Sequence, residues 1–538
     1  MIDRRQILSR LQQDEPQDLL VIGGGATGCG IALDAASRGL RVALVEKNDF
    51  GEGTSSRSTK LVHGGVRYLE VAVKHFDRRF FHLVKDALRE RAVLLRIAPH
   101  LCARLSLVTP IYKWSQVPYI YGGLKMYDVL SGSMGIGHSR LLGRREVLGH
   151  FPMLKAEGLK AGILYYDGQF NDARMAVALA LTSHAHGAVV INHAEATDLV
   201  KEGGRIAGAR IKESFSGDEF EVHAHSVVNA TGPFTDRVRR MDDRTVEPMI
   251  RASSGIHILL DKRFAPPHDG LLIPKTEDGR VLFILPWENH ALVGTTDEPA
   301  DIAEHPRVRE EEVAYLLRHV RQYFNLDVTE GDIKSSWSGL RPLVSNPKAV
   351  DTAQLSRDHV IEVSGSGLLT IAGGKWTTYR RMAMDMVDYV VRERGLNCAG
   401  PCRTDRIAVI GGAAYDCCGS NRLIETYGLP PDVALHFNRA YGDRSPLVAE
   451  MAAGGLGERL HPDHPFLEAE VIFGVRNEMA MRVMDVMARR IPLALLDRAA
   501  AQKVLPRVID LMAEEMLWDA GRREVEAQIA TERLSMGL

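Results

Sequence analysis

The sequence predicts an α/β protein of two or three domains whose C-terminal part is helical. Three observations predict this class: a strand–helix–strand unit at residues 18–46, later apolar strands that end in turns, and a C-terminal segment, residues 404–538, rich in Ala, Leu, Met, Arg and Glu. The chain has 538 residues, which is too long for one hydrophobic core. Its composition, 45% hydrophobic and 25% charged, is typical of a globular protein.

The first unit is predicted from hydrophobic pattern and turn residues. Residues 18–22 are a short apolar run, which indicates a buried parallel strand. Residues 26–38 place apolar residues at helical spacing, and Gly39 follows as a C-terminal cap. Residues 41–46 are a second apolar strand. This β–α–β order has the usual length of a right-handed crossover.

A glycine motif lies between the first strand and the helix. Gly23, Gly25 and Gly28 form G-x-G-x-x-G. Gly23 permits the tight turn, Gly25 lets backbone amides approach a pyrophosphate, and Gly28 lets the helix pack closely on the strand. Glu46 ends the second strand, where its carboxylate can accept hydrogen bonds from ribose hydroxyls. Together these features predict a dinucleotide site of the Rossmann type.

The remaining chain continues the α/β pattern. Residues 74–98 are predicted to form a long charged helix, and residues 185–229 and 255–297 are predicted to contain several strands. Residues 368–372 are a further apolar strand, followed by a helix. Gly400 and Pro401 mark the boundary before the helical C-terminal part.

Composition excludes several classes of function. A formal net charge of −2 gives no sign of nucleic-acid binding. Histidines and cysteines do not occur at metal-ligand spacings, so no metal site is expected, and the six cysteines are expected to be reduced. The N-terminus lacks a secretory signal, and no stretch of about 18 apolar residues predicts a membrane span. Peripheral membrane attachment stays open.

The segment after the first unit resembles a known family. Residues 54–56 (TSS), 58–61 (STKL) and 63–70 (HGGVRYLE) resemble the corresponding segment of FAD-dependent glycerol-3-phosphate dehydrogenases. The resemblance covers nearly the whole chain. Further blocks match in the same order: residues 228–233 (VNATGP), 286–287 (PW) with 294–297 (GTTD), 338–343 (SGLRPL) and 373–380 (GGKWTTYR).

The resemblance implies an architecture of the D-amino-acid-oxidase-like class. Residues 15–400 would form the FAD-dependent oxidoreductase region, and residues 401–538 a helical cap domain. Within the first region, a Rossmann-type FAD-binding domain and a substrate domain with an antiparallel sheet would be assembled from separated segments. The FAD-binding segments would be residues 15–80, 160–250 and 335–398, and the substrate-domain segments residues 81–159 and 251–334.

The resemblance also implies an activity. The family oxidises sn-glycerol 3-phosphate to dihydroxyacetone phosphate by hydride transfer to FAD, and the electrons pass to membrane quinone, ubiquinone or menaquinone. Two alternatives stay open from sequence: a glycerol-3-phosphate oxidase that uses oxygen, and a non-catalytic flavin-binding sensor.

The predicted FAD-binding residues share three chemical roles. Hydroxyl side chains would bond phosphate oxygens, glycines would allow close backbone contact, and a helix N-terminus would face the flavin. They are Gly23, Gly25, Gly28 and Glu46 of the first unit; Thr54, Ser55, Ser56, Lys60, Leu61, His63, Gly64 and Gly65 of the next segment; Ala230, Thr231 and Gly232; and Gly373, Gly374 and Thr377.

The predicted substrate site needs cations for a dianionic phosphate and an acceptor for the alcohol proton. Arg67, Arg341 and Lys375 lie in matched blocks, and arginine can bind phosphate through two parallel hydrogen bonds. Tyr68, beside Arg67, is included as a substrate contact. His257 aligns with the family's active-site histidine and is the predicted base. Lys375, or Arg341 assisting, is the competing assignment.

Residues 111–127 combine Tyr, Trp and Lys with apolar residues. This composition is typical of a membrane interface, although a buried aromatic cluster would also explain it. We therefore expect a cytoplasmic protein attached peripherally to the cytoplasmic face of the inner membrane, bacterial rather than mitochondrial. A homodimer stays open.

Overall fold

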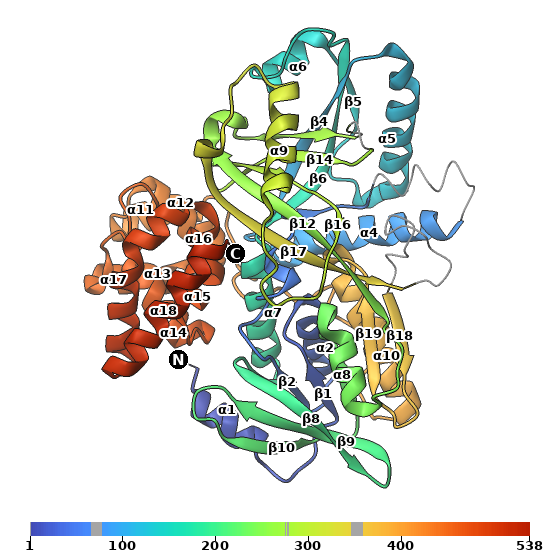
Figure 1. Cartoon of the computed structure of the whole chain (residues 1–538), viewed down its shortest axis with the longest axis vertical. Helices are drawn as coiled ribbons and strands as arrows, with labels where there is room; N and C mark the ends of the chain where they lie inside the picture. Colours follow the sequence, from blue (N-terminus) through green and yellow to red (C-terminus); the bar gives the residue numbers. More distant parts are fainter. Residues whose placement is uncertain (1, 66–77, 275, 277–278, 346–358, 538) are drawn as a thin grey trace.

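The computed structural model of the chain describes residues 2–65, 78–274, 276, 279–345 and 359–537. Figure 1 shows three regions: a sheet covered by helices around α2, a larger sheet that extends to the opposite end, and a C-terminal group of helices at the side. The α/β class with a helical C-terminal domain is confirmed.

Six strands of the described chain form the first sheet, which is parallel except at its edge, where β18 runs antiparallel to β19. The predicted apolar runs at residues 18–22, 41–46 and 368–372 are the strands β1, β2 and β19. Every residue of β1 and β2 is buried, as expected for strands covered on both faces. In spatial order the strands are β18 (His359–Val363), β19 (Leu369–Gly373), β11 (Val227–Asn229), β1 (Leu19–Ile22), β2 (Val42–Val45) and β7 (Val189–Ile191).

Helices α2 (Ala26–Ser37), α7 (Asp172–Ala185) and α10 (Tyr379–Arg394) pack together beside this sheet. The close approach of α2 and α10 depends on Gly30, because an added Cβ would lie 2.8 Å from the ring of Tyr379. The strands of the first sheet and the helices α2, α7 and α10 contribute to one continuous apolar core.

Ten strands of the described chain form the second, larger sheet. Its pairs are antiparallel, as predicted, except that β13 runs parallel to β4. These two strands are far apart in sequence, so no hairpin fixes their direction. The strands are β16 (Glu298–Pro299), β12 (Ile250–Asp261), β15 (His290–Gly294), β14 (Leu282–Trp287), β13 (Asp269–Ile273), β4 (Cys102–Ile111), β6 (Ala161–Phe170) and β3 (Leu61–Val62), with β17 (Ile333–Val344) on β12 and β5 (Arg140–Gly143) on β6.

The segment boundaries are placed differently by the strands. β3, β6 and most of β17 fall in segments assigned from sequence to the FAD-binding domain, yet they pair within the larger sheet. A strand that leaves one sheet and enters the other has no sequence signal at the crossing point, since both environments are apolar. The larger sheet thus takes strands from both sets of predicted segments, and the domain limits themselves stay a prediction.

Helices cover the larger sheet and its far end (Figure 1). The predicted helix at residues 74–98 is α4 (Arg78–Ile97), which ends before Pro99. α5 (Val117–Ser131), α6 (Arg144–His150) and α9 (Glu310–Tyr323) lie toward the opposite end from β1.

The C-terminal domain is helical, as predicted. It shares one apolar core with the larger sheet and has a second apolar core of its own. No described helix combines the length and the apolar character that crossing a membrane requires. The helices are α11 (Gly419–Tyr427), α12 (Pro431–Tyr441), α13 (Ser445–Met451), α14 (Glu468–Glu478), α15 (Val483–Asp485), α16 (Leu493–Leu496), α17 (Arg498–Met516) and α18 (Ala520–Met536).

Several helices were not predicted, and the first of them lies near the N-terminus. α1 (Arg4–Leu11) precedes the first strand and begins at Asp3, whose carboxylate accepts hydrogen bonds from the amides of Arg5 and Gln6. Its core-facing residues are only Ile7 and Leu11. That pattern is too sparse to stand out in the sequence.

Candidate active site

A cavity opens where α2 begins, beyond the carboxyl ends of β1, β2, β11 and β19. Its volume is about 1440 Å³, including the part open to solvent. This is the position where open α/β sheets bind ligands. Of the residues predicted from sequence, those that line the cavity are Gly23, Gly25, Glu46, Thr54, Ser55, Ala230, Thr231, Gly232, Gly373, Gly374 and Lys375.

The glycine turn leaves no room for side chains on its inner side. Gly23 has φ 111°, and a Cβ there would lie 2.7 Å from the carbonyl oxygen of Ala230. A Cβ on Gly28 would lie 1.8 Å from the carbonyl oxygen of Gly23. Gly25 is the N-cap of α2 and faces the cavity. The start of α2 therefore presents backbone to the cavity, as binding of an anion at a helix N-terminus requires.

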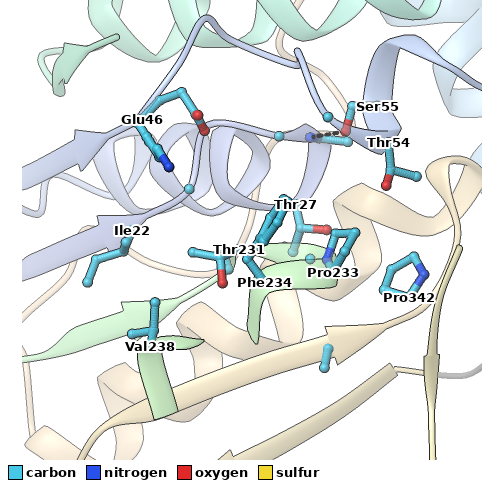
Figure 2. A pocket seen from close by; sticks show the side chains of 18 of the residues that line it. Ile22, Thr27, Glu46, Thr54, Ser55, Thr231, Pro233, Phe234, Val238 and Pro342 are labelled. Carbon is cyan, nitrogen blue, oxygen red and sulfur yellow. Dashed lines mark hydrogen bonds between the residues drawn. The ribbon is translucent and has the colours of Figure 1, made fainter. Parts of the chain in front are cut away.

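Ser55 and Glu46 hold the turn from two sides (Figure 2). The Ser55 hydroxyl accepts a hydrogen bond of 3.0 Å from the amide of Ala26, the first residue of α2. The Glu46 carboxylate accepts from the amides of Gly24 at 2.6 Å and Asn48 at 2.8 Å. Each carboxylate oxygen has a second lone pair, so Glu46 can still accept from a ribose hydroxyl. Burial raises the pKa of Glu46 above its ordinary value.

Ser56 and Lys60 are placed differently from the prediction. The Ser56 hydroxyl donates to the carbonyl of Glu52 and does not line the cavity. The Lys60 ammonium is fully buried, where it bonds Asp172 at 2.5 Å and the carbonyl of Ser56 at 2.7 Å. A buried lysine needs such a partner, because an uncompensated charge is costly away from water. Both side chains thus stabilise the segment behind the cavity.

Two later residues of that segment, His63 and Gly64, bind neighbouring side chains through their backbone amides. The amide of His63 donates to the Thr377 hydroxyl at 3.2 Å, and the amide of Gly64 donates to the Tyr127 hydroxyl at 2.7 Å. Leu61 is buried in the apolar core beneath the C-terminal domain. The other predicted residues here are Gly65, which has φ 79°, and Arg67 and Tyr68, which lie outside the described residues.

Arg341 and His257 share one face of the larger sheet. Arg341 on β17 pairs with Ser253 on β12, and His257 on β12 pairs with Trp337 on β17. Residues two or four apart on a strand point to the same side, and directly paired residues do so as well. Between them lies Gly255, where a Cβ would come 2.4 Å from the Arg341 guanidinium. The glycine gives the arginine room to lie across β12.

The Arg341 guanidinium is held in a fixed orientation. It donates to the Asp297 carboxylate at 3.1 Å and to the carbonyls of Ser254 at 3.2 Å and Thr296 at 2.9 Å. About a quarter of its side chain is exposed. Its neighbour Pro342 lines the cavity at the end that Thr54 and Pro342 mark in Figure 2, whereas Arg341 and His257 are not among the lining residues.

His257 is a buried, neutral imidazole. Its Nε2 lies 2.9 Å from the Thr59 hydroxyl, and its ring stacks on Trp337 with centroids 5.4 Å apart. Burial lowers its pKa well below 6.5, and the positive charges of Arg341 and Lys60 lower it further. The imidazole is therefore uncharged at neutral pH, and one of its ring nitrogens can accept a proton.

Sequence reasoning missed two polar partners in this part of the structure. Asp297 is the ion-pair partner of Arg341, and Thr59 is the hydrogen-bond partner of His257. Both residues lie within blocks that matched the family, at residues 294–297 and 58–61. An acid in one matched block and an arginine in another could have indicated this ion pair, because a half-buried arginine needs a carboxylate to compensate its charge.

The lining of the cavity fits FAD. A glycine turn at a helix N-terminus suits a pyrophosphate, and a carboxylate at the end of β2 suits a ribose. A second turn, Gly373–Gly374, has φ 79° and 76° and brings Lys375 to the same cavity. With these residues, the site would hold the adenosine, the pyrophosphate and the flavin along one cavity.

Comparison with known proteins supports this reading. The family described as FAD dependent oxidoreductase matches residues 18–380, and the C-terminal domain of alpha-glycerophosphate oxidase matches residues 402–523. The chain therefore belongs to the FAD-dependent oxidoreductase family, and FAD is its cofactor. The fold is the D-amino-acid-oxidase-like fold with a C-terminal helical domain that was predicted from the sequence.

Individual relatives are similar over almost the full chain. The mitochondrial glycerol-3-phosphate dehydrogenase of Mus musculus is 48% identical over 98% of this chain and 74% of its own length. The Arabidopsis thaliana enzyme of that name is 44% identical over 97% of this chain and 86% of its own length. A crystal structure of glycerol-3-phosphate dehydrogenase from Bacillus halodurans with FAD matches with a TM-score of 0.81 and 30% identity, over 99% and 97% of the two chains.

Proposed function

We propose that the protein oxidises sn-glycerol 3-phosphate to dihydroxyacetone phosphate and passes the electrons to a membrane quinone, ubiquinone or menaquinone. When bound, FAD would supply the flavin that accepts the hydride and from which the electrons then pass to the quinone. One observation carries the proposal: a cavity suited to FAD is bordered by Pro342 of β17, the strand that also carries Arg341 and pairs with the strand of His257, in a chain similar throughout to glycerol-3-phosphate dehydrogenases.

The phosphate of the substrate would be bound by Arg341 and Lys375, with Arg67 and Tyr68 as further predicted contacts. Arg341 is already oriented by Asp297 and two carbonyls, so little side-chain freedom is lost on binding. Lys375 adds a second positive charge at the cavity. Two cations suit a dianion, and the chain's own groups would orient the carbinol relative to the flavin.

Arg341→Ala is expected to raise KM for glycerol 3-phosphate much more than KM for unphosphorylated glycerol. Removal of a charged phosphate contact costs on the order of 2–4 kcal/mol. Steady-state kinetics on both substrates measures the difference, and Arg341→Lys separates charge from the fork-shaped geometry. Equal effects of Arg341→Ala on both substrates would show that Arg341 does not bind the phosphate.

The alcohol proton would be accepted by His257. The lowered pKa keeps its imidazole uncharged, and it lies on the same face as Arg341. Lys375, with Arg341 assisting, is the alternative base, since Lys375 lines the cavity itself. Either group would hold the proton near the carbinol while the hydride leaves.

Oxygen is the alternative electron acceptor. The match of residues 402–523 to the C-terminal domain of alpha-glycerophosphate oxidase is the observation that favours this alternative. Stopped-flow reoxidation of the reduced flavin distinguishes the two: a dehydrogenase is reoxidised faster by a soluble quinone analogue than by dissolved oxygen. Faster reoxidation by oxygen would identify an oxidase.

A peripheral membrane contact would lie on α5 and the turn before it. Trp114 is 61% exposed, Tyr119 48% and Val129 77%, and Leu141 of the adjacent β5 is 42% exposed. Exposed Trp and Tyr beside aliphatic side chains suit the boundary between headgroups and acyl chains. We propose that this surface places the protein at the membrane that holds the quinone. The cytoplasmic face of a bacterial inner membrane remains the predicted location.

A Trp114→Ser, Val129→Ser variant is expected to bind lipid vesicles more weakly while it still oxidises glycerol 3-phosphate with a soluble acceptor. Loss of buried apolar area lowers the affinity for the interface, and the cavity lies elsewhere in the fold. Cosedimentation with vesicles of bacterial lipid extract measures binding. The exposed pair Leu435→Ser, Leu447→Ser of the C-terminal domain serves as the control. Equal binding by both variants and the parent would remove α5 from the contact.

A further inference from the structure

The loop that follows β2 forms one wall of the FAD cavity. Residues 46–53, here called the cofactor loop, contribute Lys47, Asn48, Glu52 and neighbouring residues to the lining. The loop is also tied to the glycine turn, because the amide of Gly51 donates to the carbonyl of Gly24 at 2.9 Å. Its position therefore affects both the ribose end of the cavity and the turn that faces the pyrophosphate.

Asp49 of this loop is bound by two arginines from the C-terminal domain. Arg489 Nε and Arg490 Nη1 both donate to Asp49 Oδ2, and Arg490 Nη2 donates to Oδ1 at 3.1 Å. The Asp49 and Arg490 side chains are completely inaccessible to solvent, and Arg489 is nearly so. Both arginines lie in one π-helical turn, Val486–Arg490, a distortion often found at functional positions.

Arg489 reaches a second residue of the cofactor loop. Its Nη2 lies 3.3 Å from the carboxylate of Glu52, which lines the cavity, and 2.8 Å from Asp485 of its own domain. Burial raises the pKa of Glu52, but Arg489 and Arg533 outweigh it, so the pKa ends below its ordinary value. Carboxylates on the loop and guanidinium groups on the C-terminal domain thus compensate one another away from water.

We propose that Arg489 and Arg490 are positioning residues through which the C-terminal domain holds the cofactor loop and sets the affinity for FAD. A buried carboxylate that loses its partners must move toward water or take up a proton, and either change displaces the loop. The inference depends on FAD as the cofactor of the proposed function. It does not depend on the substrate, so the two can fail separately.

The test uses Asp49→Asn, which keeps the size of the side chain and removes the charge that the arginines compensate. Release of FAD from the purified holoprotein on dilution is followed by flavin fluorescence. The variant is expected to bind FAD at least about 10-fold more weakly, a size usual for coupling between two sites. Arg490→Lys keeps the positive charge and is expected to lose less, so it also covers the case in which Asp49→Asn does not fold.

Arg174→Met is the matched control. Arg174 on α7 forms a buried ion pair of 2.6 Å with Glu478 and joins the same two regions of the chain without contacting the cofactor loop. Its thermal stability is expected to fall, while its affinity for FAD stays within about 3-fold of the parent, below the usual size of such coupling. An equal loss of FAD in Arg174→Met and Asp49→Asn would overturn the proposal, since any loosening of the domain would then suffice.

Hydrogen exchange supplies a readout that is independent of activity. In the FAD-free protein, amides of residues 46–53 are expected to exchange faster in Asp49→Asn than in the parent or in Arg174→Met. Unchanged exchange in this loop together with unchanged FAD affinity would show that the ion pairs do not position it.

Discussion

A Gly25→Val variant is expected to purify without FAD. Gly25 faces the cavity at the start of α2, and an added Cβ would already lie 3.1 Å from the Ser55 hydroxyl. The branched side chain of valine would occupy the space where a pyrophosphate must approach the backbone. The ratio of flavin absorbance to protein absorbance measures the loss. A variant with a full complement of FAD would show that this turn does not bind the cofactor.

Gly521→Val controls for the general effect of a new valine. Gly521 lies in the first turn of α18, where the nearest contact of an added Cβ is an ordinary 3.6 Å from Asp519. This variant should keep its FAD. Loss of FAD from both variants would indicate a non-specific effect on folding.

His257→Gln is expected to slow reduction of the flavin by glycerol 3-phosphate by roughly 10²–10⁴-fold, the usual contribution of a positioned general base. In the parent, the rate should rise with pH as His257 loses its proton and becomes able to accept another. Because burial, Arg341 and Lys60 lower the pKa of His257, this rise should lie well below pH 6.5. Stopped-flow absorbance under anaerobic conditions measures the rate.

Two comparisons limit the interpretation of that variant. Substrate affinity should change much less than rate, because the phosphate contacts are elsewhere. His290→Gln, a second histidine of the same sheet, should reduce its flavin at the parental rate. Near-normal reduction in His257→Gln, with an unchanged pH profile, would move the role of base to Lys375 or to a water.

Local elements were predictable because their signals are local. The apolar run of β1, the glycine turn and the helical spacing of α2 lie within residues 18–46 and agree with one another. The turn between β14 and β15 is equally local, since Glu288 and Asn289 take positive φ there. Agreement between pattern, turn chemistry and cap is what makes such a prediction reliable.

Long-range pairs were not predictable from one sequence. Lys60 was expected beside the flavin, but Asp172, distant in sequence, draws its ammonium into the interior. The two arginine partners of Asp49 are more than 400 residues away. The same holds for the parallel pairing of β13 with β4. In each case the local sequence allows more than one placement of the side chain or strand, and a partner distant in sequence determines which placement is adopted.

The central claim is that glycerol 3-phosphate reduces the flavin held in this cavity. The most direct measurement is anaerobic mixing of the purified holoprotein with glycerol 3-phosphate while the flavin absorbance is recorded. The account predicts bleaching of the oxidised flavin with formation of one dihydroxyacetone phosphate per FAD. An oxidised spectrum that persists with glycerol 3-phosphate, but bleaches with a chemical reductant, would contradict it.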